Sequence, residues 1–223
     1  MRGYLNLFIL TMLIIPINGS GQNINSYNID AKLNSEDKTI EIYQIMKFKN
    51  TSNTPLKEIF LEDWSNSYLD NTTSLAKRIS DEYSRSFSFA QKKQRGSSSI
   101  NNIKSNNIET WERLDDALDI IKVNLKKPIS TGGSIEIEIY YSIKLPDSKF
   151  TGYGYDDDNF YLKNWLIVFS NISNSIWYNQ SNLNLDDQSL QKAGYKLKIS
   201  FDEDLHLFSN LIKNNTEVSN NIK

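Results

Sequence analysis

The chain has 223 residues, of which 39% are hydrophobic and 12% aromatic, and this apolar content is sufficient for one folded domain and too high for a disordered chain. The net charge is −2, so no overall basic field would attract phosphates, and we expect no nucleic-acid partner. Cysteine is absent, which excludes both a disulfide framework and a lipid-anchored lipoprotein start.

The N-terminus has the three parts of a secretory signal peptide. Arg2 supplies a positive start, residues 5–15 form an apolar run, and residues 19–21 are small residues that a signal peptidase could cleave. The run is too short for a comfortable membrane span, so we rank a retained N-terminal anchor lower. We expect residues 1–21 to be a signal peptide, the mature chain to be exported to the periplasm or the extracellular space, and no membrane contact beyond the signal peptide.

Apolar and polar residues alternate with period two along most of the mature chain, which is typical of half-buried strands. Residues 27–33 and 40–48 alternate on either side of an NSED turn and predict a hairpin. Residues 121–125 lead through KKPISTGG into 135–145 and predict a second hairpin, and 195–201 predict another strand. The expected fold is mostly β, with antiparallel sheets in a β-sandwich or saddle-like arrangement.

One segment, near residues 74–92, breaks this pattern. Leu75, Ile79, Tyr83 and Phe87 recur every fourth residue, and Gly96 stands where a helix would stop. We therefore expect a helical excursion from the β fold. Its basic residues are interleaved with acidic ones, so a solvated helix face is favoured over an anion-binding site.

Residues that could carry catalysis or hold a metal are scarce. His206 is the single histidine, so neither a histidine-based triad nor a two-histidine zinc helix can be built, and its place between two leucines in an expected strand favours a structural role. Asp156, Asp157 and Asp158 are consecutive and cannot all point at one ion. We expect no catalytic residue, no metal ligand and no cofactor in this chain.

A set of aromatic residues in the C-terminal half has two interpretations. It could form a stacking platform for sugars or peptides, but several members alternate with apolar neighbours, which favours packing in the core and between sheets. The set is Tyr153, Tyr155, Phe160, Tyr161, Trp165, Trp177 and Tyr178.

Five segments, in this order, resemble the N-terminal, non-catalytic β domain of the aminopeptidase N-like zinc metallopeptidases, particularly exported bacterial members. They are FLEDWSNSYLDNTTSLAKR, RSFSFAQKKQRG, VNLKKPISTGGSIEIEIYYSIKLP, FYLKNWLIVF and LHLFSNL. The first matches the family's W-x-N-x-Y with Trp64, Asn66 and Tyr68. One departure is that the family's W-Y-P reads Trp165, Leu166, Ile167 in this chain, so the local turn should differ.

The resemblance implies a function that this chain cannot perform alone. In the family, zinc and the general-base glutamate lie in a following catalytic domain, which would be the partner of this chain, together with the peptide substrate. The family's N-terminal domain lends one polar side chain to the rim that holds the substrate's amino group. The candidates for this rim in the present chain are Lys163 and Asn164, together with the adjacent Trp165. The implied organisation is a β domain over residues 22–210 and a polar tail over 211–223, frayed or truncated.

An alternative of a different class is a stand-alone secreted β-sandwich module that binds a glycan or a protein through exposed aromatic residues. If the resemblance to the peptidase domain holds instead, the tail after Ile212, which has no alternating apolar face, is poorly suited to cover the 195–201 strand. A free strand edge favours association between sheet edges, so we expect the isolated chain to self-associate.

Overall fold

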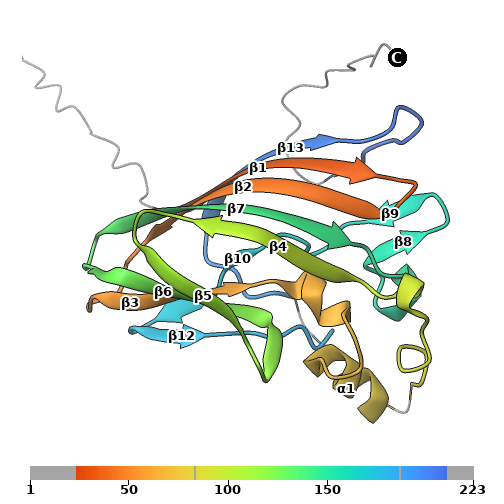
Figure 1. The fold of residues 1–223 in the computed structure, drawn as a ribbon, viewed down its shortest axis with the longest axis horizontal. Helices are drawn as coiled ribbons and strands as arrows, with labels where there is room; N and C mark the ends of the chain where they lie inside the picture. Colours follow the sequence, from red (N-terminus) through yellow and green to blue (C-terminus); the bar gives the residue numbers. More distant parts are fainter. Residues whose placement is uncertain (1–23, 83, 186, 210–223) are drawn as a thin grey trace, which may run out of the picture.

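Two sheets of unequal size make up most of the computed structural model, which describes residues 24–82, 84–185 and 187–209 (Figure 1). The larger sheet has the strand order β13 (Ala193–Ser200), β1 (Asn25–Asn34), β2 (Thr39–Lys49), β7 (Ser134–Lys144), β4 (Ser97–Lys104). The smaller sheet has the order β10 (Val168–Phe169), β3 (Leu56–Glu62), β6 (Ala117–Ile129), β5 (Ile108–Leu114). The mostly β, mostly antiparallel fold expected from the sequence is confirmed.

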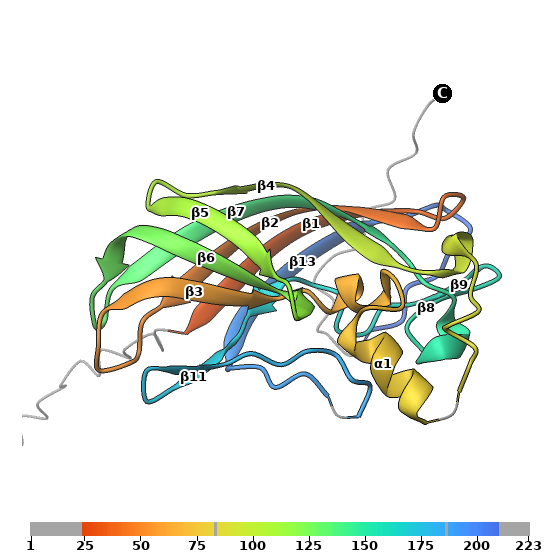
Figure 2. The ribbon, with the colours of Figure 1, turned by 60° about the horizontal axis from the view of Figure 1, so that its bottom comes forward.

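The remaining elements are short. Two strand pairs are β8 (Gly154–Asp156) with β9 (Asn159–Tyr161), and β11 (Asn171–Ser173) with β12 (Ile176–Tyr178). The helical elements are α1 (Ser74–Asp81) and the 3-10 turns η1 (Trp64–Tyr68), η2 (Lys92–Gln94) and η3 (Ser148–Phe150). In Figure 2 the larger sheet arches over the smaller one, with α1 at one end.

The core lies between the two sheets and is built from the alternating residues. On β7 the odd-numbered residues from Ile135 to Ile143 are buried, whereas their even-numbered neighbours face outward. From the smaller sheet, Ile59, Leu61 and Val123 are fully buried against them. Each sheet thus covers one apolar face of the other, which is the main stabilising contribution in such a sandwich.

The first expected hairpin is confirmed, because β1 and β2 pair antiparallel from Ser26 opposite Lys47 to Asn34 opposite Thr39. The expected C-terminal strand is also present as β13. It pairs with β1 in parallel, over eight consecutive residues, and is therefore an exception in a mostly antiparallel fold.

The second expected hairpin is wrong. The β6 strand pairs with β3 and β5, whereas β7 pairs with β2 and β4, so the turn between them crosses from one sheet to the other. Asn50, after β2, fixes this crossing. Its side-chain nitrogen Nδ2 donates to the Ile129 carbonyl at 2.9 Å, and its backbone forms hydrogen bonds with Gly132 and Gly133. Gly132 has a φ of 74°, a conformation that favours glycine.

The helical segment is shorter than its period-four pattern predicts. The helix begins after Thr73, whose side chain accepts a hydrogen bond from the Ala76 amide, and ends at Asp81. Phe87 is fully buried but lies in turns, where the Arg95 guanidinium stacks 4.8 Å from its ring and donates to its carbonyl. Gly96 does not stop a helix.

A close approach explains Gly96 instead. A Cβ at this position would lie 2.7 Å from Cδ of Pro146, which precedes η3, so only glycine fits beside that proline. His206 likewise departs from its expected place, because it lies outside any regular element and is exposed. Its neighbour Leu205 packs against the core, so the two leucines beside His206 do not indicate a strand.

The expected signal peptide lies outside the described residues, as does the tail over residues 211–223. Within the described part, no helix is long and apolar enough to cross a bilayer.

Candidate functional site

The stretch that follows β3 is polar in sequence and buried in the structure. All five residues of η1 are buried, and their polar groups have partners from distant segments. Ser65 Oγ donates to the Trp165 carbonyl at 3.1 Å, and Trp64 Nε1 donates to the Gln180 carbonyl at 2.6 Å. Because buried polar groups are costly without such bonds, η1 holds both segments in place.

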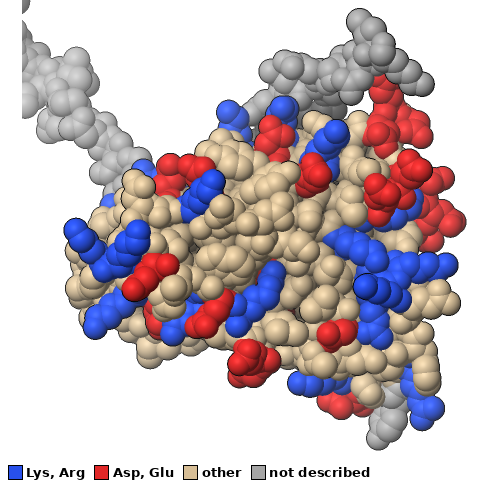
Figure 3. Space-filling view, in the orientation of Figure 1, with Lys and Arg blue, Asp and Glu red and all other residues tan. Residues whose placement is uncertain are grey.

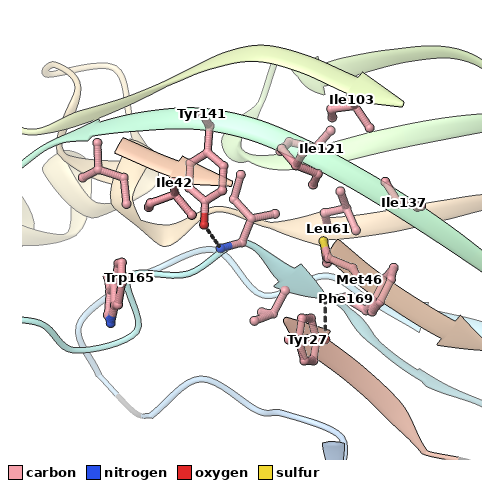
Figure 4. Close-up of a cluster of buried hydrophobic side chains, with 14 of the residues drawn as sticks. Tyr27, Ile42, Met46, Leu61, Ile103, Ile121, Ile137, Tyr141, Trp165 and Phe169 are labelled. Atoms are coloured by element: carbon pink, nitrogen blue, oxygen red, sulfur yellow. Dashed lines mark hydrogen bonds between the residues drawn. The ribbon is translucent and has the colours of Figure 1, made fainter. Parts of the chain in front are cut away.

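The second segment of the site precedes β10 and is fixed from the opposite sheet (Figure 4). The Ile167 amide donates to Tyr141 Oη at 3.3 Å, Tyr141 Oη donates to Gln44 Oε1 at 2.8 Å, and Gln44 Nε2 donates to the Ile167 carbonyl at 2.6 Å. Tyr27 Oη also accepts from the Phe169 amide, at 3.1 Å. The backbone that carries Lys163, Asn164 and Trp165 is thereby anchored to the larger sheet.

The 3-10 turn η1 and the segment that carries Lys163 and Asn164 meet at a small polar pocket with a volume of about 20 Å³. It is lined by Trp64, Tyr68, Thr151, Tyr153, Lys163, Asn164, Asn182 and Asn184. Of the rim candidates, Lys163 and Asn164 therefore line it, whereas Trp165 is buried in the core cluster. Asn164 has a φ of 51°, a left-handed conformation that asparagine tolerates.

The sequence did not identify the other polar residues of the pocket. Thr151, Asn182 and Asn184 belong to loops that have no periodic pattern. Asn182 is held from two sides: its amide nitrogen Nδ2 donates to Ser67 Oγ at 2.9 Å, and its Oδ1 accepts from the Asn184 backbone at 3.0 Å. The pocket wall is therefore preorganised by hydrogen bonds.

Two buried carboxyl groups hold the loop that contributes Asn182. Burial raises the pKa of Glu62 to about 7, although hydrogen bonds from Gln188 and from the Gln180 backbone lower it. Burial also raises the pKa of Asp119, which accepts from the Asn182 amide at 2.7 Å. Both carboxyl groups accept hydrogen bonds only from neutral donors, so the rise in pKa caused by desolvation outweighs the fall caused by the hydrogen bonds.

A third carboxyl group, Asp63, is fully buried and paired with a cation. Arg113 approaches it at 2.7 Å, and Ser98 Oγ donates to the same oxygen, Oδ2. The other oxygen, Oδ1, is buried without a hydrogen-bond partner. Although Glu62, Asp63 and Asp119 are all close to η1, the described residues contain no group of three or more acidic, histidine or cysteine side chains that could hold a metal ion.

The acidic run at residues 156–158 ends β8 and forms the turn of the β8–β9 hairpin. Lys38 from the β1–β2 turn donates to the Asp157 carbonyl at 3.0 Å and lies 5.0 Å from the centre of the Phe160 ring. The run therefore interacts with a lysine.

The aromatic set divides between core and surface. Tyr153 and Trp165 are buried, and Trp177 packs partly buried against the rings of Phe48 and Phe60, whereas Tyr161 and Tyr178 are about half exposed. The face in Figure 3 carries basic and acidic side chains close together rather than a field of one sign.

No family model matches this chain, and no curated protein sequence matches it. Among solved structures, part of the chain is similar to an M1 zinc metallopeptidase from Deinococcus radiodurans, with a TM-score of 0.30 and 12% identity, over 56% of this chain and 22% of that one. Another match is described as the unique CBM3 of Hungateiclostridium clariflavum, with a TM-score of 0.22 and 11% identity, over 66% of this chain and 100% of that one. At these scores neither likeness supports an inference about function.

Proposed function

We propose that this chain is the N-terminal, non-catalytic β domain of an exported zinc aminopeptidase. In this role it supports a separate catalytic domain, lends polar groups to the rim that holds a peptide's amino group, and hydrolyses nothing by itself. The observation that carries the proposal is that two segments with the family's motifs line one pocket: Trp64 and Tyr68 come from the first, Lys163 and Asn164 from the second.

The size of the pocket and the asparagine residues in its lining suit an amino group. Its volume of about 20 Å³ is close to the space that one water molecule needs, and an ammonium group is of similar size and donates three hydrogen bonds. Asn164 and Asn184 line the pocket, and the side-chain oxygen of an asparagine is a neutral acceptor. A lysine would repel an ammonium group, and Lys163 is itself paired with Asp187 at 3.0 Å, so Asn164 is the better rim residue.

Zinc would be held by the proposed catalytic domain. When bound there, it would polarise the scissile carbonyl and activate water. The residues of this chain would contribute binding and orientation of the peptide's amino terminus, which accelerate a reaction only through the geometry that they impose.

A hydrolysis assay tests the non-catalytic half of the proposal. The purified chain, incubated with amino-acid anilides with and without added zinc, should release no product above a heat-denatured control. Turnover that a chelator abolishes and zinc restores would overturn the proposal, because it would require a metal site in this chain.

A binding module remains the second candidate because of one observation. Tyr43 and Tyr140 lie directly opposite each other on β2 and β7, and both are about two-fifths exposed on the outer face of the larger sheet. Exposed aromatic rings on the outer face of a sheet can stack on sugars or on a protein partner. Retention of the wild-type chain on an insoluble glucan, lost in Tyr140→Ala, would favour this candidate.

A further inference from the structure

The larger sheet has a regular, open edge at β13. This strand pairs with β1 through eight consecutive residues without a register shift, and no strand of the described residues pairs with its other side. Figures 1 and 2 show β13 at the margin of the sheet. An edge of this kind presents unpaired backbone N–H and C=O groups to any extended chain.

Other sheet edges are interrupted. The register of β4 shifts between Ile100 and Asn102, and β5 has two such shifts against β6. Bulges of this kind disrupt a ladder and deter the addition of a strand. β13 contains neither a bulge nor a proline.

The core side of β13 is apolar and incompletely covered. Tyr195 stacks on Tyr27 with ring centres 4.8 Å apart, yet 41% of its surface is exposed. Leu197 and Ile199 pack against the core and are also only partly buried. An added strand with apolar residues on this side would cover them and gain hydrophobic free energy.

The outer side of β13 is basic. Lys198 forms an ion pair with Asp30 at 3.2 Å, whereas Lys196 has no ion pair among the described residues. Gly194 leaves open space on this side, next to a hollow of about 470 Å³ that is also lined by Lys196, Lys47 and one acidic residue, Glu136. The strand itself carries two lysines and no acidic residue. The charge complementary to this side is negative.

We propose that β13 docks an extended segment of a partner protein in which apolar and acidic residues alternate. The apolar residues would cover Tyr195, Leu197 and Ile199, and the acidic residues would face Lys196 and Lys198. Backbone bonds supply affinity in such strand addition, and the alternating side chains supply selectivity.

Two other occupants fit less well, including the second copy that the self-association expected from the sequence would place at this edge. A second copy of the chain would bring four lysines together on one face, because Lys196 and Lys198 would lie beside their own copies, and like charges across strands are destabilising. The chain's own residues 210–223 contain one acidic residue, Glu217, and no apolar alternation.

Hydrogen exchange with two synthetic peptides tests the proposal. One eight-residue peptide alternates valine with glutamate, and the other alternates valine with lysine. The valine–glutamate peptide should slow exchange of the β13 amides that do not bond to β1 by about tenfold, and the valine–lysine peptide should have a smaller effect. The charge-reversed variant Lys196→Glu/Lys198→Glu should prefer the valine–lysine peptide, and a fully N-methylated valine–glutamate peptide should fail with both proteins.

Four results would overturn the proposal. They are no slowing with either peptide, equal slowing with both peptides in both proteins, protection of these amides in the dilute free chain, and protection that grows with protein concentration without peptide. The last two would identify the chain's own segment or a second copy as the occupant. None of these results bears on the polar pocket or on hydrolysis, so failure of the proposed function would be recognised separately.

Discussion

Tyr141 of the larger sheet and Ile167 of the segment before β10 are joined in a closed hydrogen-bonded ring through Gln44. The Tyr141 and Gln44 side chains are fully buried. Because the ring satisfies both backbone groups of Ile167, it fixes the chain three residues beyond Asn164. The rim of the pocket is therefore positioned by a network in the core.

Tyr141→Phe should destabilise the protein by about 1–3 kcal/mol. The backbone amide of Ile167 and the side-chain oxygen Oε1 of Gln44 would then remain buried without a partner. The measurement is urea unfolding. Tyr140→Phe, the neighbouring position on the exposed face of the same strand, is the matched control and should change stability by less than about 0.5 kcal/mol. Equal stability of the two variants would contradict the role of the ring.

Trp64→Ala and Trp165→Ala should each cost about 3–5 kcal/mol, since both indoles are buried and their removal leaves cavities. Trp64 also loses its bond to the Gln180 carbonyl. Trp111→Ala, on the partly exposed strand β5, should cost less. Thermal unfolding measures these losses, and a small loss at Trp64 or Trp165 would show that the indole is not part of the core.

Glu62→Gln should flatten the pH dependence of stability. Because the folded-state pKa of Glu62 is raised to about 7 from 4.5, the folded state binds more protons than the unfolded state between these values. The stability contributed by this group is therefore fully present below the unfolded pKa and is lost as pH rises through about 7. The raised pKa of Asp119 acts in the same direction, so some slope should remain.

Chemical unfolding at pH 5 and pH 8 measures this effect. The variant should gain stability relative to the wild type at the higher pH. If the difference in unfolding free energy between the variant and the wild type is the same at both pH values, Glu62 does not titrate in this range.

Arg113→Met should destabilise the protein by about 3–5 kcal/mol, because it leaves the Asp63 carboxylate buried without its cation. Asp63→Asn/Arg113→Met should be more stable than the single Arg113 variant, since no buried charge is then unpaired. A double-mutant cycle measures the coupling. Additive losses would argue against the ion pair as the source of the effect.

The sequence predicted which residues face the core better than it predicted which strands pair. Alternation along β6 and β7 correctly marks their buried faces, but the same pattern and the same Pro-Gly turn suit a hairpin and a crossing between sheets. The period-four spacing of Phe87 with Leu75 does not reflect a continuous helix. Phe87 is apolar because its ring packs against Tyr68 and Phe150 in the tertiary structure.

The site was predictable only where a motif marked it. Lys163 and Asn164 came from the family resemblance, and they line the pocket. Asn182 and Asn184 lie in a loop whose position depends on the buried Glu62 and Asp119, and no local pattern shows that pairing. The local sequence contains one indication of the site. Two acidic residues, Glu62 and Asp63, lie directly between an apolar strand and Trp64, where a buried carboxyl group needs hydrogen-bond partners.

The central claim is that the pocket beside Asn164 receives a peptide's amino group. NMR titration of the isotopically labelled chain with a millimolar alanine tripeptide amide, against its N-acetylated form, tests it most directly. The account predicts that the side-chain amide signals of Asn164 and Asn184 shift with the free-amino peptide alone. Asn164→Leu should abolish the shift at Asn184, whereas Asn101→Leu, on β4 and outside the pocket, should not. Equal shifts with both peptides, or none at either asparagine, would contradict the claim.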